Sequence, residues 1–310
     1  MTKLTEFTFL STDGKTRLHA MEWCPEGDVR AVVQILHGVS EHISRYDHFA
    51  RFLCDHGFAV VGHDHLGHGD SVGEGDTPIF FGHGNTWNTV VDDAYALHCR
   101  IKESYPGTKL VLMGHSMGSF LCRTYLIRYA GTVDAAIVMG TGWQSGAKLS
   151  GGLAIAGLMA KKDPANASAF VNNLAFGSYN APFKPQRTAF DWLSADTDNV
   201  DAYIADPKCG EPATVGLFHE MLWGIRFNQR FSSLDKMDRH TPVLLISGGD
   251  DPVGDMGRGV RQTYTEFKRS GVADCTLILY PGLRHEILNE KAQQDKVYGD
   301  ILSWLEDKVG

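Results

Sequence analysis

Residues 110–118 read Leu110-Val111-Leu112-Met113-Gly114-His115-Ser116-Met117-Gly118, and this stretch decides the fold. Its first four residues form an apolar run typical of a buried strand, and the next five have the form G-x-S-x-G. Segment 119–129 then carries apolar residues at helical spacing. A serine on a sharp turn between a strand and a helix is held above the sheet, where a base can reach its hydroxyl. Ser116 is therefore the candidate nucleophile; the alternative is a glycine-rich turn whose serine only caps the helix.

Apolar strand patterns alternate with amphipathic helix patterns on both sides of this turn. We expect strands over 31–36, 58–62, 110–113, 135–139, 242–246 and 275–280, and helices over 46–56, 87–105, 259–269 and 289–308. This alternation predicts an α/β fold with a mostly parallel central sheet of about eight strands, covered by helices on both faces. Segments 5–10 and 19–24 form an expected hairpin that adds antiparallel strands at one edge.

Residues 143–230 break this rhythm. They contain no clear strand, an apolar stretch over 151–160, and several aromatic side chains. An insertion between two strands of such a sheet lies over the carboxyl ends of the strands, where ligands bind. The sequence therefore predicts a core of residues 1–142 and 231–310 and a helical cap over 143–230 that suits an apolar ligand. The alternative is a helical subdomain without a role in binding.

Composition excludes several classes of function. The formal net charge of −8 argues against a nucleic-acid partner, because phosphate binding needs clustered Lys and Arg. No apolar stretch approaches the roughly 20 residues of a membrane span, and the N-terminal segment lacks the apolar core of a secretory signal. The six cysteines are scattered without a C-x-x-C pair, which is typical of reduced, buried thiols. We expect a cytoplasmic location.

A serine nucleophile needs a neutral imidazole, and the imidazole needs a carboxylate that orients it. His285 lies in a Pro-Gly loop after the last expected strand and is the candidate base. Asp250 and Asp251 follow the strand over 242–246, and Asp255 is a third candidate acid. The order serine, aspartate, histidine along the chain matches the α/β-hydrolase architecture. Periodicity does not separate the neighbouring aspartates.

The tetrahedral intermediate of such a reaction needs two N–H donors for its oxyanion. Met117, which directly follows the serine, is expected to supply the first donor. Val39, in the loop His37-Gly38-Val39-Ser40-Glu41-His42 after the strand over 31–36, is the expected second donor. The alternative for this loop is an ordinary turn that caps a helix.

The chain resembles α/β-hydrolases of the monoacylglycerol lipase and lysophospholipase group, which is similar to the serine aminopeptidase S33 group. The stretches that carry the resemblance are 37–42 with Arg45-Tyr46, Asp64-His65-Leu66-Gly67-His68-Gly69-Asp70-Ser71, 114–118, 248–255 and 282–285. They run in the family's order over nearly the whole chain. The resemblance implies that Asp251 is the acid, that Val39 and Met117 form the oxyanion hole, and that no cofactor or metal is needed.

These motifs predict a serine carboxylester hydrolase acting on a small ester with an apolar acyl chain, such as a monoacylglycerol, a lysophospholipid or a short-to-medium acyl ester. Amide or C–C bond cleavage by the same triad is the alternative, and a binding protein on this fold is a weaker one. A zinc hydrolase using His63, His65 and His68 is a further alternative, although Gly67 stands where its aspartate ligand belongs. The apolar character of the cap is also compatible with transient contact between the cap and a membrane surface. The oligomeric state stays open.

Overall fold

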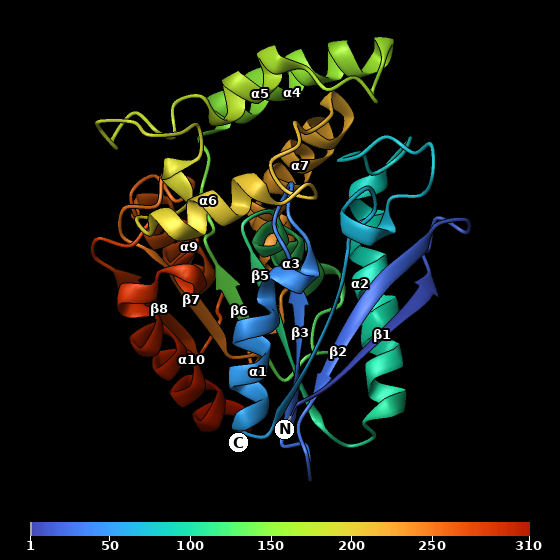
Figure 1. Cartoon of the computed structure of the whole chain (residues 1–310), viewed down its shortest axis with the longest axis vertical. Helices are drawn as coiled ribbons and strands as arrows, with labels where there is room; N and C mark the ends of the chain where they lie inside the picture. The colour runs from blue at the N-terminus through green and yellow to red at the C-terminus, as the bar shows by residue number, and fades with distance from the viewer. Residues whose placement is uncertain (1) are drawn as a thin grey trace.

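One eight-stranded sheet forms the centre of this structure, a computed structural model in which residues 2–310 are described. The strand order is β1-β2-β4-β3-β5-β6-β7-β8 (Figure 1). Strands β1 and β2 pair antiparallel, as do β2 and β4, and all other neighbours are parallel. The predicted parallel sheet with an antiparallel edge is therefore confirmed. The strands are β1 (Lys3–Leu10), β2 (Arg17–Cys24), β3 (Ala31–Leu36), β4 (Phe58–His63), β5 (Lys109–His115), β6 (Ala135–Met139), β7 (Val243–Gly248) and β8 (Cys275–Tyr280).

Helices cover both faces of the sheet, so its central strands are buried on both sides. In β3, Val32 belongs to the apolar cluster on one face and Val33 to the cluster on the other. This alternation follows from the two-residue period of a strand and explains why β3 is a continuous apolar run. The first cluster includes side chains of α2 (Thr86–Ser104), α3 (Met117–Arg128) and α9 (Arg258–Arg269), and the second includes those of α1 (Asp47–Asp55) and α10 (Gln294–Val309).

Within residues 2–310, short 3₁₀ turns lie in the connecting loops, four of them between a strand and the next helix and one, η3, between α5 (Ala169–Phe176) and α6 (Thr197–Ala205). They are η1 (Ile43–Tyr46), η2 (Gly69–Ser71), η3 (Asp191–Leu193), η4 (Ile287–Asn289) and η5 (Lys291–Gln293). The turns η4 and η5 occupy the start of the helix that we expected over 289–308. Helix α10 consequently begins later, at Gln294.

The chain between β6 and β7 is helical, and we refer to residues 143–230 as the cap. Helices α4 (Gly146–Lys162) and α5 (Ala169–Phe176) lie at the end of the molecule farthest from the termini (Figure 1). Helices α6 (Thr197–Ala205) and α7 (Val215–Asn228) lie between them and the sheet, and α8 (Phe231–Leu234) returns the chain to β7. The helical cap expected from the sequence is confirmed.

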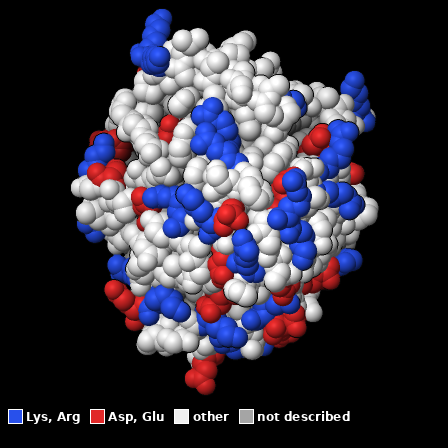
Figure 2. All heavy atoms as spheres, turned by 180° about the vertical axis from the view of Figure 1, so that it is seen from behind, with Lys and Arg blue, Asp and Glu red and all other residues white. Residues whose placement is uncertain are grey.

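Charged side chains of both signs are interspersed over the lower part of the face in Figure 2, whereas the cap end is largely uncharged apart from isolated basic groups. Several large apolar side chains are exposed on α4 and α5: Ile155, Leu158, Phe170 and Leu174. Among residues 2–310, no helix combines the length and the apolar character that crossing a membrane requires.

Candidate active site

Ser116 lies on a strained turn between β5 and α3. Its backbone has φ 55° and ψ −121°, a conformation that non-glycine residues rarely adopt and that costs on the order of 1–3 kcal/mol. Two contacts hold it in place: the Ser116 N–H donates to the Met139 carbonyl at 3.0 Å, and the Ser119 hydroxyl donates to the Ser116 carbonyl at 2.6 Å. The turn therefore fixes the serine at the carboxyl end of β5, beside the end of β6.

The two glycines of the motif allow this turn to pack closely. A Cβ atom on Gly114 would collide with the Gly118 carbonyl oxygen, and a Cβ atom on Gly118 would collide with the Leu36 carbonyl oxygen. The start of α3 consequently rests directly against the end of β3. Larger residues at either position would force the serine turn away from the neighbouring strand.

His285 and Asp251 meet beneath the loop that follows β8. Nδ1 of His285 lies 3.0 Å from Oδ2 of Asp251, and both side chains are buried, with relative exposures of 2% and 0%. The second oxygen of Asp251 accepts the Val253 N–H at 2.8 Å, so this carboxylate is held in one orientation. The structure thus brings Asp251 to His285, whereas Asp255 is exposed and pairs with Arg258.

Asp250 behaves differently from its neighbour. It is half-buried, and its N–H donates to the Leu283 carbonyl at 3.0 Å. Its side chain has no hydrogen bond to His285 among the described residues 2–310. Of the two neighbouring aspartates that periodicity did not separate, the structure places Asp251, and not Asp250, against His285.

The loop after β3 lies against the serine. A Cβ atom built on Gly38 would stand 2.6 Å from Oε1 of Glu41 and 3.0 Å from the Cβ of Ser116, so a side chain here would crowd both neighbours. The Gly38 N–H donates to Oε1 of Glu41 at 2.6 Å, which fixes the loop one residue before Val39. Gly38, the residue before Val39, therefore lies next to Ser116, and Met117 follows the serine at the first position of α3.

The Ser116 hydroxyl makes no hydrogen bond within residues 2–310 of this structure. The His285 ring nevertheless lies close to the serine turn, with its centroid 4.7 Å from the ring of His115, the residue before Ser116. A serine and its base often approach to hydrogen-bond distance only when a substrate is bound.

A buried set of charged side chains supports the turn and both loops. Nδ1 of His115 lies 3.2 Å from Oε1 of Glu41, and Nε2 of His115 donates to the His285 carbonyl at 3.2 Å. Burial disfavours the charged form of Glu41, but the hydrogen bond to His115 and the charge of Arg45 outweigh it and hold the pKa of this carboxyl well below its usual range. Burial also opposes protonation of His115, yet the hydrogen bond to Glu41 raises the pKa of the imidazole. The pair is therefore ionic and joins the Gly38 loop to the His285 loop.

Arg45 extends this set toward the cap. It donates to Oε2 of Glu41 at 2.8 Å and makes two hydrogen bonds to Glu286, at 2.7 and 2.8 Å. Asn199 of α6 donates to the same Glu286 carboxylate at 2.8 Å. The guanidinium lies over the ring of Tyr203, 4.9 Å from its centroid. Residues of α6 are thus bonded to the loop that carries His285.

Aromatic side chains of the cap cover His285. The ring of Trp192 lies 5.1 Å from the ring of His285, and Phe176 stacks on Trp192 at 6.1 Å. Phe176 also contacts Phe218 of α7, with ring centroids 5.5 Å apart. The surface next to the candidate base is therefore apolar and is built from cap residues.

The three histidines of the zinc alternative do not converge on one point. Nδ1 of His65 lies 3.3 Å from Nε2 of His63, but Nδ1 of His68 faces the Leu66 carbonyl at 2.9 Å. Burial lowers the pKa of His63 and His68 to about 3, so both rings are neutral. Within residues 2–310, the groups whose ligand atoms lie close enough to share an ion do not include this set.

Sequence reasoning missed several residues of this site. Trp192 appeared only as one aromatic residue of the cap, and no pattern placed it over His285. Glu41 and Glu286 received no role, although a carboxylate within a loop of small and apolar residues is an unusual signal. Arg45 was noticed in the motif after the loop, but its bond to Glu286 joins positions 241 residues apart, which periodicity cannot reveal.

The fold and the position of Ser116 on it define an α/β-hydrolase. The sequence pattern of the family described as serine aminopeptidase, S33 matches residues 27–292, and the chain belongs to this family. It is 29% identical over 307 residues to a monoacylglycerol lipase of Mycolicibacterium smegmatis, covering 97% of this chain and 96% of the relative. It is 26% identical to the monoglyceride lipase of Homo sapiens, covering 97% of this chain and 90% of the relative.

Solved structures agree with this assignment. A thermostable carboxyl esterase from Bacillus coagulans, determined in complex with glycerol, superposes with a TM-score of 0.93 at 26% identity and full coverage of both chains. A monoglyceride lipase variant from Saccharomyces cerevisiae has the same fold, with a TM-score of 0.76 at 20% identity over 100% of this chain and 96% of that one. The chain is therefore a carboxylic ester hydrolase of the monoacylglycerol lipase type.

Proposed function

We propose that Ser116, His285 and Asp251 form the catalytic triad of this esterase. The observation that carries the proposal is the 3.0 Å hydrogen bond between His285 and the buried Asp251, at the sheet edge where Ser116 stands on its strained turn. A carboxylate in this position holds the imidazole in the tautomer that accepts a proton at Nε2 and stabilises the imidazolium that forms. The residues next to Ser116 complete the set that the reaction needs.

In the proposed reaction, Nε2 of His285 takes the proton of Ser116 while the serine oxygen attacks the ester carbonyl. The N–H groups of Val39 and Met117 donate to the oxyanion of the tetrahedral intermediate. His285 then gives the proton to the departing alcohol, which leaves an acyl-enzyme. Water attacks this ester by the same route and releases the carboxylic acid. The reaction uses no cofactor or metal.

We propose monoacylglycerols, lysophospholipids or short-to-medium acyl esters as substrates, with residues 143–230 as the cap that selects among them. The relatives named above as lipases support this class, and so does the apolar surface that Trp192 and Phe176 form beside His285. A groove of about 710 Å³ runs along α4 and α7 and is lined in part by Leu153, Ala154, Gly157 and Leu158 from the apolar stretch 151–160. Ser116 does not line this groove, so the groove does not hold the ester bond that reacts. We propose that it accepts the far end of a long acyl chain whose ester group lies at Ser116.

Replacement of Ser116 tests the mechanism. We expect Ser116→Ala to reduce kcat/KM for p-nitrophenyl esters by at least about a thousandfold, because nucleophile and base act as a unit. The variant should also fail to react with a fluorophosphonate probe that labels the wild-type protein once. Retention of esterase activity within tenfold would contradict the mechanism.

An ester series tests the substrate class. Rates with p-nitrophenyl acetate through palmitate, measured beside a monoacylglycerol and a lysophospholipid, should peak beyond butyrate. A sharp optimum at acetate would contradict the acyl groove while leaving the triad intact. Because the family is described as a serine aminopeptidase, an amino-acid p-nitroanilide belongs in the same series. A higher kcat/KM for the anilide than for every ester would favour amide hydrolysis.

A further inference from the structure

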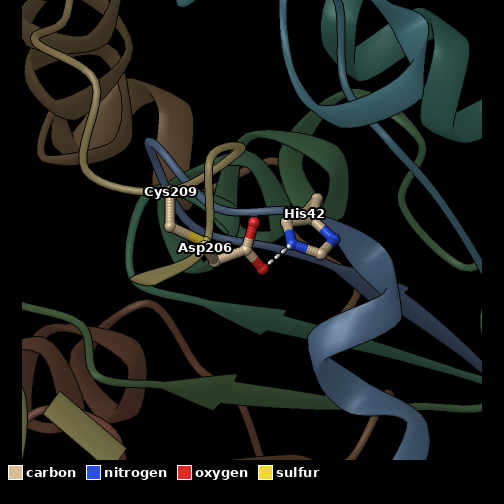
Figure 3. A group of neighbouring side chains, drawn as sticks. All are labelled: His42, Asp206 and Cys209. Carbon is tan, nitrogen blue, oxygen red and sulfur yellow. Dashed lines mark hydrogen bonds and ion pairs between the residues drawn. The ribbon is translucent and has the colours of Figure 1, made fainter. Parts of the chain in front are cut away.

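Three potential metal ligands from two distant parts of the chain meet at the junction of core and cap. His42 precedes η1 in the core, whereas Asp206 and Cys209 follow α6 in the cap (Figure 3). Nε2 of His42, a carboxylate oxygen of Asp206 and Sγ of Cys209 all lie within 4.8 Å of one another. The first two are already in contact, with Nε2 of His42 2.8 Å from Oδ2 of Asp206.

The donor atoms of this group suit one kind of ion. An imidazole nitrogen, a carboxylate oxygen and a thiolate sulfur are the ligands that Zn²⁺ takes in proteins, at about 2.0–2.3 Å from the metal. Ligands on a tetrahedral ion at these distances lie about 3–4 Å from one another. Small side-chain rotations are therefore enough to close the group around a metal. The sulfur disfavours Mg²⁺ and Ca²⁺, which prefer oxygen ligands.

Neighbouring groups hold the ligands in the orientation that binding requires. Nδ1 of His42 lies 2.8 Å from Oγ of Ser44, so Nδ1–H can donate to the hydroxyl while Nε2 faces the metal position. Oδ1 of Asp206 accepts the Lys208 N–H at 2.9 Å, which leaves Oδ2 directed at His42. The Cys209 N–H donates to the Asp206 carbonyl at 3.0 Å, and this turn places both cap ligands on one side.

Hydrogen bonds independent of the ligands already hold the two segments together. The Gly210 N–H and the Tyr203 hydroxyl both donate to the Ser40 carbonyl, each at 3.0 Å. The Ser40 hydroxyl donates to the Glu211 carbonyl at 2.7 Å. The loop and the cap segment that carry the three ligands are therefore already in contact, and metal binding does not require them to associate.

Charge at the junction is compatible with a divalent cation. Arg45 is the cation that acts on both Asp206 and Cys209, but it is bound to the carboxylates of Glu41 and Glu286. Lys208 is directed away, to Asp70 at 2.6 Å. The carboxylates around Arg45 thus offset its charge, and Asp206 adds a further negative charge.

Access and burial also fit a bound ion. His42 and Cys209 are buried, while the side chain of Asp206 is 29% exposed. The exposed side of Asp206 provides an entry path and a position for a water as fourth ligand, as in zinc sites with three protein ligands. The second group of close ligands, His19, Asp64 and Asp70, fits less well, because Asp64 already accepts N–H groups of Ile43 and Asp70.

We propose that His42, Asp206 and Cys209 bind one Zn²⁺ ion that joins the cap to the loop after β3. The thiol proton of Cys209 is released to solvent when the sulfur binds. His42 lies three residues beyond Val39, so the ion would hold the loop that packs against Ser116. This site is separate from the proposed reaction, which needs no metal, and a protein with Ser116→Ala would bind Zn²⁺ in the same way.

Metal titration tests the site. All proteins carry Cys99→Ser, because Cys99 is a free, exposed thiol and would compete for the metal outside the proposed site. Competition with a chromophoric chelator should give one equivalent of Zn²⁺ for this background. Cys209→Ser, His42→Gln and Asp206→Asn should each weaken binding by about tenfold or more. The matched controls Cys275→Ser and His240→Gln, at positions outside the group, should leave the affinity unchanged.

Two further readouts keep the test independent of variant stability. Co²⁺ bound to the background protein should give a thiolate-to-metal charge-transfer band that Cys209→Ser abolishes. Zn²⁺ should raise the Tm of the background protein but not that of Cys209→Ser. Absence of stoichiometric binding, absence of the thiolate band, or an affinity in the three ligand variants that equals that of the background protein would each overturn the proposal. Loss of esterase activity in Ser116→Ala has no bearing on this result, so the two proposals fail separately.

Discussion

Ser116 shows how one residue depends on contacts made elsewhere in the chain. Its positive φ is unfavourable by itself, and it persists because the Met139 carbonyl and the Ser119 hydroxyl hold the peptide groups on either side. Gly118 adds the close approach of α3 to β3 that a side chain would prevent. The position of the serine on its turn is thus set by backbone geometry and does not depend on a base.

The assignment of Asp251 as the acid of the proposed triad can be tested by Asp→Asn substitutions, which replace one carboxylate oxygen by an amide nitrogen. Asp251→Asn keeps the shape of the side chain, but it removes the negative charge that stabilises protonated His285, so we expect kcat/KM to fall by about 10³–10⁴-fold. Asp250→Asn is the matched control, since this neighbour has no bond to His285, and it should stay within a few-fold of wild type. Ester hydrolysis is the measurement, with Tm as the check on folding. The reverse order of effects would move the acid to Asp250.

At this scale the sequence identified candidates for the reacting residues but not their surroundings. Ser116 and His285 stand in loops whose glycines and positions after strands are local signals. The choice of Asp251 over Asp250 depends on which carboxylate points at His285, and both directions fit the same strand pattern. Glu41 and Trp192 reach the site through contacts between distant segments, which no local spacing encodes.

At the scale of elements, α7 belongs to the cap in sequence but packs like a core helix. Trp87 of α2 donates from its indole to the Thr124 hydroxyl of α3 at 3.0 Å, and that hydroxyl donates to Asn228 of α7 at 2.8 Å. Asn228 donates in turn to the Phe120 carbonyl at 2.8 Å. The three helices are therefore joined by a buried polar chain whose members satisfy one another.

Two glycines in cap helices should respond oppositely to the same substitution. A Cβ atom on Gly224 of α7 would collide with the Trp87 ring, so Gly224→Ala should lower the free energy of unfolding by about 1–3 kcal/mol. Gly151 of α4 is exposed with no atom near its Cβ position, and Gly151→Ala should raise the free energy by about 0.5–1 kcal/mol. Urea unfolding measures both. Equal effects of the two would show that α7 does not pack on Trp87.

Element boundaries were predicted best where apolar runs are flanked by strong breakers. The strands over 31–36, 135–139 and 275–280 have the bounds expected from the sequence. The last helix starts later than expected because η4 and η5 carry helix-like residues with tighter backbone turns. In the cap, helix positions follow contacts with α2, α3 and the His285 loop, so the sequence indicated a helical insertion without fixing its arrangement.

At the scale of the whole molecule, four buried histidines form a neutral group at the sheet edge. His37, His63, His65 and His68 have ring centroids 4.1–6.3 Å apart along the group. Burial is the main cause that lowers the pKa of all four imidazoles. A ring in this place binds its proton at a lower pH than the same ring in the unfolded chain, so acid favours the unfolded chain.

This group predicts a loss of stability on mild acidification. His63 and His68 ionise near pH 3 when folded and near 6.5 when unfolded, so their stabilising effect is lost as the pH falls below 6.5. Between pH 6.5 and 5.0 each should lower the free energy of unfolding by roughly 1.5 kcal/mol. Burial raises the pKa of Asp93 to about 6, which offsets about 1 kcal/mol over the same interval. The net loss from these three groups is about 2 kcal/mol.

Urea unfolding at pH 6.5 and 5.0 measures this loss. Asp93→Asn should increase it by about 1 kcal/mol, because the opposing carboxyl group is gone. The exposed His240 is the control, and His240→Gln should leave the difference between the two pH values unchanged. The pKa of His115 is raised in the folded protein, so this group binds its proton more tightly when folded and partly offsets the loss at the upper end of the interval. An unfolding free energy that is flat from pH 6.5 to 5.0 would contradict the neutral group.

The placement of α7 divides the cap into parts with different freedom to diverge. Substitutions on the exposed sides of α4 and α5 meet mostly solvent and the groove that we propose for the acyl chain. Homologous recombination that exchanges these helices between related esterases is therefore expected to alter acyl-chain choice. A crossover within α7 would instead separate Asn228 from Thr124 and Gly224 from Trp87, which must be inherited together. In chimaeric enzymes, the exchanged segment that carries α4 and α5 should therefore end before Thr214. All of α7 and the core helices that it contacts then come from the same parent.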